Sequence, residues 1–83
     1  DEMARYLKVH VIKSNGNKVS LTMPARCADD LEGIMDESVK ESINKQNINL
    51  QVIQDKAQKS GFIPQTLFEL HDEERDMKVW LDH

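Results

Sequence analysis

Cysteine, glycine and long apolar runs are scarce in this 83-residue chain, and each scarcity excludes a class of protein. The single cysteine, Cys27, cannot form a disulfide within the chain, which is typical of proteins from a reducing compartment. The only glycines, Gly16, Gly33 and Gly61, form no phosphate-binding glycine loop. No apolar run approaches the roughly 20 residues that a membrane-spanning helix needs. The sequence therefore contains no disulfide framework, no glycine-loop nucleotide motif and no membrane span.

Positive charge is also in short supply, with 11 Lys and Arg against 15 Asp and Glu and a net charge of −4. No nucleic-acid ligand is expected, because neutralising phosphates takes a surplus of Lys and Arg. The hydrophobic fraction of 39% and the charged fraction of 31% fit a soluble globular chain. We interpret residues 1–83 as a single small domain, excised from or attached to a longer protein, because the sequence opens Asp1-Glu2-Met3.

Alternation of apolar and polar residues predicts two strands near the start of the chain, over residues 6–13 and 18–23. Pro24 is expected to stop the second strand, because proline cannot donate to a ladder. Most apolar residues of each strand fall on one face: Leu7, Val9 and Val11 in the first, and Val19, Leu21 and Met23 in the second. Tyr6 and Ile12 fall on the opposite face of the first strand.

The turn between these strands decides which side chains face the core. A two-residue turn on Asn15-Gly16 would pair Ile12 with Val19 and put the two apolar sets on opposite faces. A three-residue loop pairs Val11 with Val19 and puts both sets on the same face. We therefore predict the three-residue loop, with Gly16 in the left-handed region.

Helical spacing begins after the second strand. Its apolar stripe consists of residues four apart, with two neighbours beside them: Leu31, Met35, Val39 and Ile43, with Cys27 and Ile34. Gly33 costs about 1 kcal/mol relative to alanine in a helix, so we expect loose first turns. The polar residues 44–47 are expected to end this helix.

A second helix has well-marked ends. Asn49 can cap its start, and Ile48 and Ile53 stand at the two positions of a hydrophobic staple. Gly61 can supply a left-handed C-cap. We predict a helix between Asn49 and Gly61.

Two further strands are predicted over residues 66–71 and 77–81, joined by the charged segment 72–76. Because that segment lacks glycine, we expect a four-residue loop built on a type I turn. The complete order is β-β-α-α-β-β. It indicates an α+β fold, in which two hairpins form a four-stranded antiparallel sheet and two helices pack on one face.

This pattern resembles a module of uncharacterised bacterial proteins that carry an N-terminal SHOCT-like helical hairpin and occur with cell-envelope stress operons. The matching segments are Tyr6-Leu7-Lys8-Val9-His10-Val11, Gly16, Met23-Pro24, Ile48-Asn49-Leu50, Ile53, Ala57, Gly61 and the hairpin Asp72–Leu81. The chain departs from the family at Ala25-Arg26-Cys27 and at Phe62-Ile63-Pro64. The resemblance implies a cytoplasmic accessory or regulatory module and brings no catalytic residues with it.

The residues best suited to chemistry are scattered. His10, His71 and His83 lack the spacing of metal ligands, although His10 and His71 could meet across adjacent strands near Cys27. Cys27 lies near a predicted helix N-terminus, which favours a reactive thiolate, but a small apolar side chain on the helix stripe is the better interpretation. We expect neither a metal site nor a cofactor site.

Acidic residues cluster at 36–37 and 72–76. General acid–base catalysis needs two carboxylates in unlike environments within a cleft, and a small chain that fills its core has little room for one. We interpret these residues as solvated charges and expect a protein that is not an enzyme.

One group of side chains is expected to point away from the helices on the outer face of the sheet: Tyr6, Ile12, Leu67 and Trp80. Aromatic residues are enriched where proteins bind each other. Our leading hypothesis is a non-enzymatic interaction or regulatory module that binds a protein partner or forms a homodimer, through this outer face or an exposed edge strand.

A second hypothesis is a domain that senses a small ligand or lipid between the helices and the sheet. Three methionines are placed where they could line such a pocket: Met23, Met35 and Met77. Methionines at these spacings also fill ordinary cores.

Overall fold

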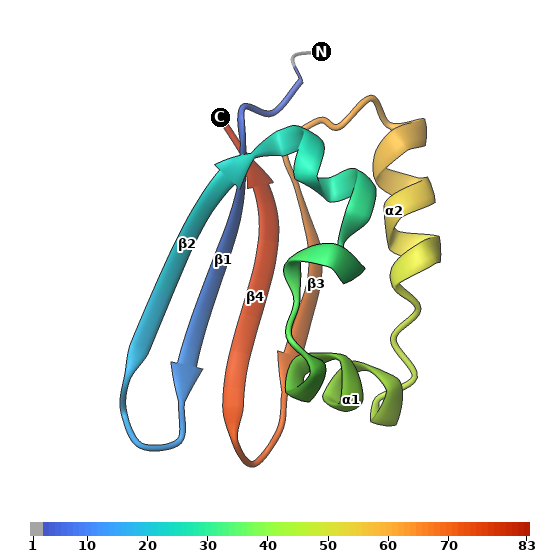
Figure 1. The fold of residues 1–83 in the computed structure, drawn as a ribbon. Helices are drawn as coiled ribbons and strands as arrows, with labels where there is room; N and C mark the ends of the chain where they lie inside the picture. The colour runs from blue at the N-terminus through green and yellow to red at the C-terminus, as the bar shows by residue number, and fades with distance from the viewer. Residues whose placement is uncertain (1–2) are drawn as a thin grey trace.

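The order of elements is β-β-α-α-β-β in the computed structural model, which describes residues 3–83, with two short 3₁₀ helices before the first α-helix (Figure 1). The elements are β1 (Tyr6–Lys13), β2 (Lys18–Pro24), η1 (Ala25–Asp30), η2 (Glu32–Ile34), α1 (Glu37–Lys45), α2 (Leu50–Lys59), β3 (Gln65–His71) and β4 (Arg75–Asp82). The predicted fold class is confirmed. Within residues 3–83, no helix is both long and apolar enough to span a membrane.

The four strands lie in the order β2-β1-β4-β3, so the first and last strands of the chain form the centre of the sheet. Every neighbouring pair is antiparallel. Val11 pairs with Val19, which confirms the three-residue loop. Gly16 has φ +91°, as that loop requires.

The core lies between one face of this sheet and the helices. Its largest fully buried side chains are Leu7, Leu31, Ile43, Leu70, Val79 and Leu81. Four of these six are contributed by β1, β3 and β4, and none by β2. The buried centre is therefore displaced toward β4 and β3, which the helices cover in Figure 1.

The first predicted helix is broken in the structure. Gly33 donates its backbone N–H to Asp30 Oδ1 (3.1 Å), and a side chain at Gly33 would collide with that carboxylate. Met35 is extended, and Asp36 then caps α1 by accepting the Val39 N–H (3.0 Å). The apolar stripe was predicted correctly as buried, but it runs over two 3₁₀ helices and one nine-residue α-helix.

The second helix has the predicted ends. The Asn49 side chain accepts the Val52 N–H (3.2 Å), and Gly61 follows the helix with φ +77°. The Phe62 N–H then donates to the Ala57 carbonyl (2.9 Å), which is the long bond of a Schellman motif.

The end of α1 repeats this geometry without glycine. Asn47 has φ +59°, and the Ile48 N–H donates to the Ile43 carbonyl (3.1 Å). Asparagine tolerates the left-handed region better than other residues with a side chain. The polar segment 44–47 thus ends the helix, as predicted.

Candidate functional site

The predicted outer-face residues are exposed to different degrees. Tyr6 is 42% exposed and Ile12 is 37% exposed, whereas Trp80 is half-buried. Tyr6 and Ile12 are six residues apart on β1, which corresponds to about 20 Å. Lys8 and His10 lie between them on the same face. Tyr6 and Ile12 are therefore too far apart to contact each other.

Ionic contacts occupy the middle of the outer face. Lys8 pairs with Asp82 across the two central strands (Nζ–Oδ2 3.1 Å), and Lys78 Nζ lies 5.5 Å from the centre of the Trp80 ring. The His83 N–H and then the Lys8 ammonium lower the pKa of the Asp82 carboxyl from its ordinary value. The outer face therefore carries charged side chains beside its aromatic and apolar ones, and one lysine lies over the Trp80 ring.

Leu67 lies apart from the other three predicted residues. The pairing of β3 with β4 shifts between Thr66 and Phe68, so Leu67 is the extra residue of a β-bulge. Its side chain packs against the core and lines a shallow hollow with Val52 and Ile53 of α2. The bulge was not visible in the alternation of the sequence.

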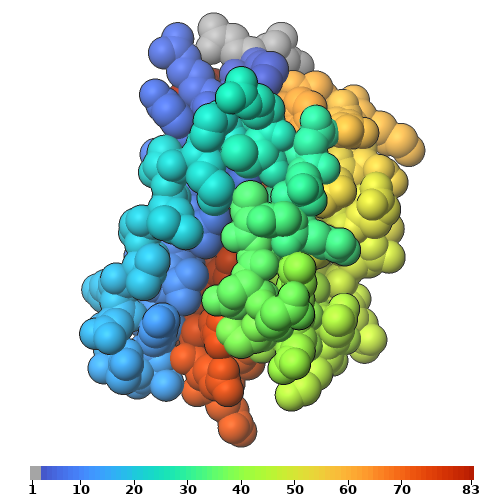
Figure 2. Space-filling model, in the orientation of Figure 1, coloured from blue at the N-terminus to red at the C-terminus, as the bar shows by residue number. Residues whose placement is uncertain are grey.

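The inner side of the β1–β2 hairpin carries apolar side chains that the helices leave open. Val19 is 37% exposed and Leu21 is 49% exposed. Together with Val11 and Ile34 they line a hollow of about 210 Å³ between the hairpin and the helices. We call these four residues the apolar strip. Figure 2 shows the hairpin standing clear of the helices, with part of the sheet visible between them.

The free edge of β2 carries backbone groups that have no hydrogen-bond partner among residues 3–83. The Lys13 N–H donates to the Asn17 carbonyl (2.8 Å), and the Ala25 N–H donates to the Arg5 carbonyl (3.1 Å). Hydrogen-bonded pairs alternate along an antiparallel ladder, so the odd-numbered residues of β2 bond to β1. The even-numbered residues point their N–H and C=O groups toward the open edge: Lys18, Ser20, Thr22 and, with its carbonyl alone, Pro24.

β2 stops at Pro24, as predicted, and the parity explains why Pro24 is itself part of the strand. Pro24 is the last residue of the strand, at a position where an N–H would face the open edge. Its missing donor therefore costs no bond within the sheet.

The opposite edge of the sheet, β3, is interrupted in three ways. It contains the bulge at Leu67, and Gln46 Nε2 donates to the carbonyl of His71 (2.7 Å). Exposed Glu69 adds a charge. Bulges, charges and covering groups prevent edge strands from pairing with another chain. On β2 the only charged residue is Lys18, at its first position, so β2 is the more accessible edge.

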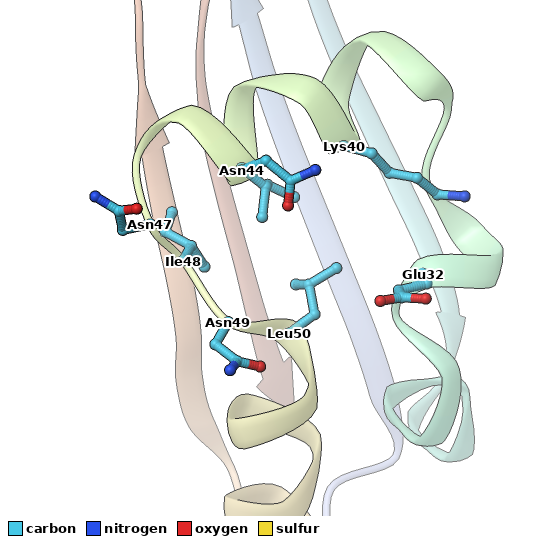
Figure 3. Close-up of a pocket in the computed structure, with 8 residues that line it drawn as sticks. Glu32, Lys40, Asn44, Asn47, Ile48, Asn49 and Leu50 are labelled. Atoms are coloured by element: carbon cyan, nitrogen blue, oxygen red, sulfur yellow. The ribbon is translucent and has the colours of Figure 1, made fainter.

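A larger hollow of about 500 Å³ lies where α1 meets α2 (Figure 3). Its floor contains buried Ile43 and Leu50, and the other lining residues are Glu32, Lys40, Asn44, Asn47, Ile48 and Asn49. The Asn49 amide oxygen already caps α2. Pockets for small organic ligands are mostly apolar, and the rim of this hollow is polar.

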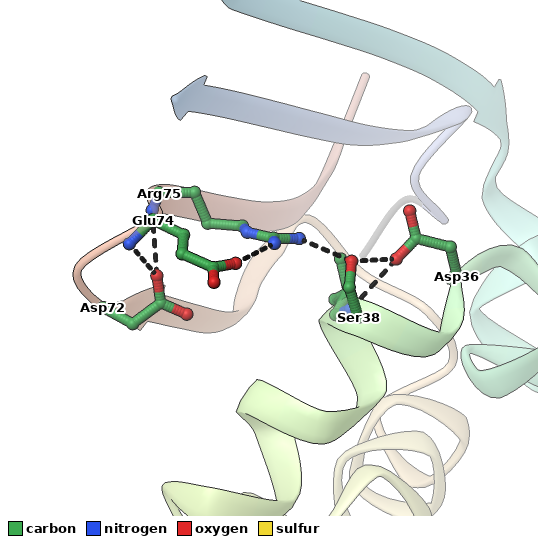
Figure 4. Close-up of polar contacts among 6 residues, drawn as sticks. Asp36, Ser38, Asp72, Glu74 and Arg75 are labelled. Carbon is green, nitrogen blue, oxygen red and sulfur yellow. Dashed lines mark hydrogen bonds and ion pairs between the residues drawn. The ribbon is translucent and has the colours of Figure 1, made fainter. Parts of the chain in front are cut away.

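A polar cluster ties the last hairpin to the start of α1 (Figure 4). Asp72 Oδ1 accepts the N–H groups of Glu74 and Arg75 (both 2.8 Å), so the strands are separated by residues 72–74 rather than by a four-residue loop. Arg75 donates to the Ser38 hydroxyl (3.3 Å), which donates to Asp36 Oδ1 (2.9 Å). Every contact in this chain of bonds positions the turn or caps the helix.

Two pKa values in this cluster are displaced in the same direction. The nearby Ser42 hydroxyl and the backbone N–H groups of the turn lower the pKa of the Asp72 carboxyl. The Val39 N–H and the Ser38 hydroxyl lower the pKa of the Asp36 carboxyl. Both carboxylates are thus held in the charged form. A general acid at neutral pH needs the opposite displacement.

The histidines and the cysteine are not brought together. His10 is on β1 and His71 on β3, and β4 lies between these strands, so the two do not meet across adjacent strands. His71 instead contacts Asp76 (3.0 Å), which raises the pKa of the imidazole. Cys27 is partly buried on η1 against the core. Within residues 3–83, no three His, Cys, Asp or Glu side chains form a group that could hold a metal ion.

Comparison with protein-family models, with curated proteins and with solved structures found no match. The geometry of the chain itself is therefore the basis for a functional proposal. The combination that stands out is the open β2 edge with the apolar strip beside it. The sequence led us to expect an exposed edge strand as one possible interaction surface, but it did not single out β2 or the apolar strip. The sequence signal was present in the alternating segment Val19–Met23, whose apolar side was expected to be buried.

Proposed function

We propose that this chain is a non-enzymatic protein-interaction module that binds an extended segment of a partner protein along β2. The observation that supports it is the row of N–H and C=O groups at Lys18, Ser20 and Thr22 that find no partner within the described part of the chain, residues 3–83. An extended backbone presents matching groups at the same two-residue spacing. The exposed side chains of Val19 and Leu21 add an apolar surface for alternate residues of the bound segment.

Peptide selection tests this proposal. Extended peptides selected for binding to the whole chain should lose at least about tenfold in affinity when Ser20→Pro removes the central edge donor. Glu69→Pro is the matched control, because its N–H faces the free edge of β3. Equal effects of the two substitutions on selected peptides would contradict binding at β2.

The outer face is tested by the same peptides. A Trp80→Ala variant should leave their affinity unchanged, because the Trp80 side chain points away from the apolar strip. Peptides that depend on Trp80 and not on Ser20 would instead place the docking surface at Tyr6, Ile12 and Trp80.

A second candidate is the sensing of a small apolar ligand, supported by the hollow between the helices and the sheet. Met35 and Met77, two of the three methionines predicted for such a pocket, line it. Its volume of about 210 Å³ is below the roughly 300 Å³ at which typical ligand pockets begin. A short acyl chain fits better than a drug-sized molecule. A chemical-shift titration with short fatty acids that leaves Met35 and Met77 unchanged would remove this candidate.

The resemblance to the SHOCT-associated bacterial modules extends the proposal to a cytoplasmic regulatory role. In that setting the bound segment would belong to another protein of an envelope-stress response. Expression of the gene under envelope stress is the measurement that tests this extension, and an unchanged transcript level would contradict it.

A further inference from the structure

The backbone groups on the free edge of β2 are complementary to themselves when two copies lie antiparallel. We infer that the occupant of this edge is a second copy of the chain, which joins the two sheets into one of eight strands. This inference rests on the proposed function, since it uses the same edge. It goes further in naming the partner and its register.

The parity of the ladder permits few registers. Only even-numbered residues face the edge, so each edge residue must oppose an even-numbered residue of the second copy. Two registers of the seven-residue strand form six hydrogen bonds each: one with Ser20 on the two-fold axis and one with Leu21 on it. In the second, Pro24 contributes its carbonyl and lacks only its N–H. Hydrogen bonding alone does not choose between them.

The apolar side chains decide the register. With Leu21 on the axis, it faces Leu21 of the second copy, and Val19 faces Met23 of the second copy. All three apolar residues of β2 are then matched, in the non-hydrogen-bonded pairs where side chains approach most closely. With Ser20 on the axis, Met23 would instead lie opposite Asn17 of the second copy. The register centred on Leu21 buries more apolar surface.

Charge is compatible with this register. Lys18 is the only charged residue of β2, and it lies opposite Pro24 of the second copy rather than opposite a like charge.

Each chain carries a net charge of −4, so two copies repel at long range. Salt screens that repulsion, because the Debye length falls from about 30 Å at about 0.01 M to about 8 Å at about 0.15 M. Association should therefore strengthen as salt is added over this range.

The dimer should be weak. A single pair of seven-residue strands lies at the small end of protein interfaces, below about 1,200 Å². Weak and transient complexes lie at this end of the range, so we expect a dissociation constant above about 1 µM. The two-fold axis is perpendicular to the sheet, so the helices of both copies lie on the same side. The apolar strips of the two copies would then lie next to each other on that side of the sheet, between the two sets of helices.

Cysteine cross-linking tests the register directly in the whole chain. In a Cys27→Ser background, Leu21→Cys places two sulfur-bearing residues about 4.5 Å apart between Cα atoms, within the disulfide range. Val19→Cys is the matched control on the same strand and face, because the two copies of residue 19 lie about 13 Å apart in this register. With oxidised glutathione as the oxidant, Leu21→Cys should form a dimer at least about tenfold faster than Val19→Cys.

Sedimentation of the wild type up to millimolar concentration should show a monomer–dimer equilibrium that Ser20→Pro abolishes. Faster cross-linking at Val19→Cys or Ser20→Cys than at Leu21→Cys would overturn the register, and a wild type that stays monomeric would overturn the second copy as occupant. In that last case, peptides whose affinity depends on Ser20 would still support the proposed function. If the wild type stays monomeric and peptide affinity does not depend on Ser20 either, both the dimer and the proposed function are contradicted.

Discussion

Proline substitution can determine which backbone groups of β2 are free. Ser20→Pro removes an N–H that points to the open edge, whereas Leu21→Pro removes one that bonds to the Val9 carbonyl. We expect Ser20→Pro to change the free energy of unfolding by less than about 1 kcal/mol. Leu21→Pro should lower it by about 2–3 kcal/mol, because it leaves the carbonyl of buried Val9 without its donor.

Leu21→Pro also removes the leucine side chain, whose contribution to the free energy of unfolding can be measured separately and subtracted. It is 49% exposed, so its truncation in Leu21→Ala should cost about 1 kcal/mol, near half the value of a fully buried leucine. The difference between Leu21→Pro and Leu21→Ala then reports the backbone bond. Urea unfolding followed by the fluorescence of Trp80, the only tryptophan, measures all three variants. A loss of 2 kcal/mol corresponds to roughly 10 °C in Tm for a domain of this size.

Equal losses for the two proline variants would refute the reasoning. Such a result would mean that the Ser20 N–H is bonded within the sheet, and the alternation inferred for β2 would be wrong. Both the open edge of β2 and the pairing of two β2 strands would then be contradicted.

Three further substitutions test the core, the helix end and the dependence on pH. Leu70→Ala should cost about 2–5 kcal/mol in urea unfolding, because Leu70 is fully buried, and a loss below 1 kcal/mol would contradict its place in the core. Gly61→Ala should cost about 1 kcal/mol from its φ of +77° alone, since the space around it is open, and an unchanged midpoint would argue against the left-handed cap. Asp36 has a pKa lowered from its ordinary 3.8 by the Val39 N–H, so its contribution to stability is present above that value and lost as the pH falls through the folded pKa. Asp36→Asn keeps the cap and should flatten the loss of stability below about pH 4; an unchanged slope would show that other carboxylates control acid unfolding.

Local patterns in the sequence were sufficient for the hairpin register and for the ends of α2. The register of β1 with β2 depends on the turn at Gly16 and on matched apolar faces, which are both encoded within about 20 residues. The caps at Asn49 and Gly61 are likewise local. The break before Asp36 was missed, although Asp36-Glu37-Ser38 is a recognisable helix start. The periodic apolar stripe through Met35 favours a continuous helix and masks this start.

The candidate site depends on long-range features that a single sequence does not contain. Alternation shows which side chains of β2 share a face, but not that the helices cover β4 and β3 and stop short of Val19 and Leu21. The order of strands follows from pairing between residues more than 60 positions apart, as Leu7 with Leu81. Exposure of Tyr6 and Ile12 was predicted correctly, whereas the bulge that turns Leu67 toward α2 had no sequence signal.

The central position of the first and last strands affects how the protein can fold during synthesis. Until β4 has left the ribosome, the β1–β2 hairpin has no neighbour and both of its edges are open. Contacts of such high sequence separation also slow folding, because a long loop must close before they form. Docking of β4 against β1 covers one of those edges, and β2 keeps the other. The hairpin therefore exposes two edges before β4 docks and only the β2 edge afterwards.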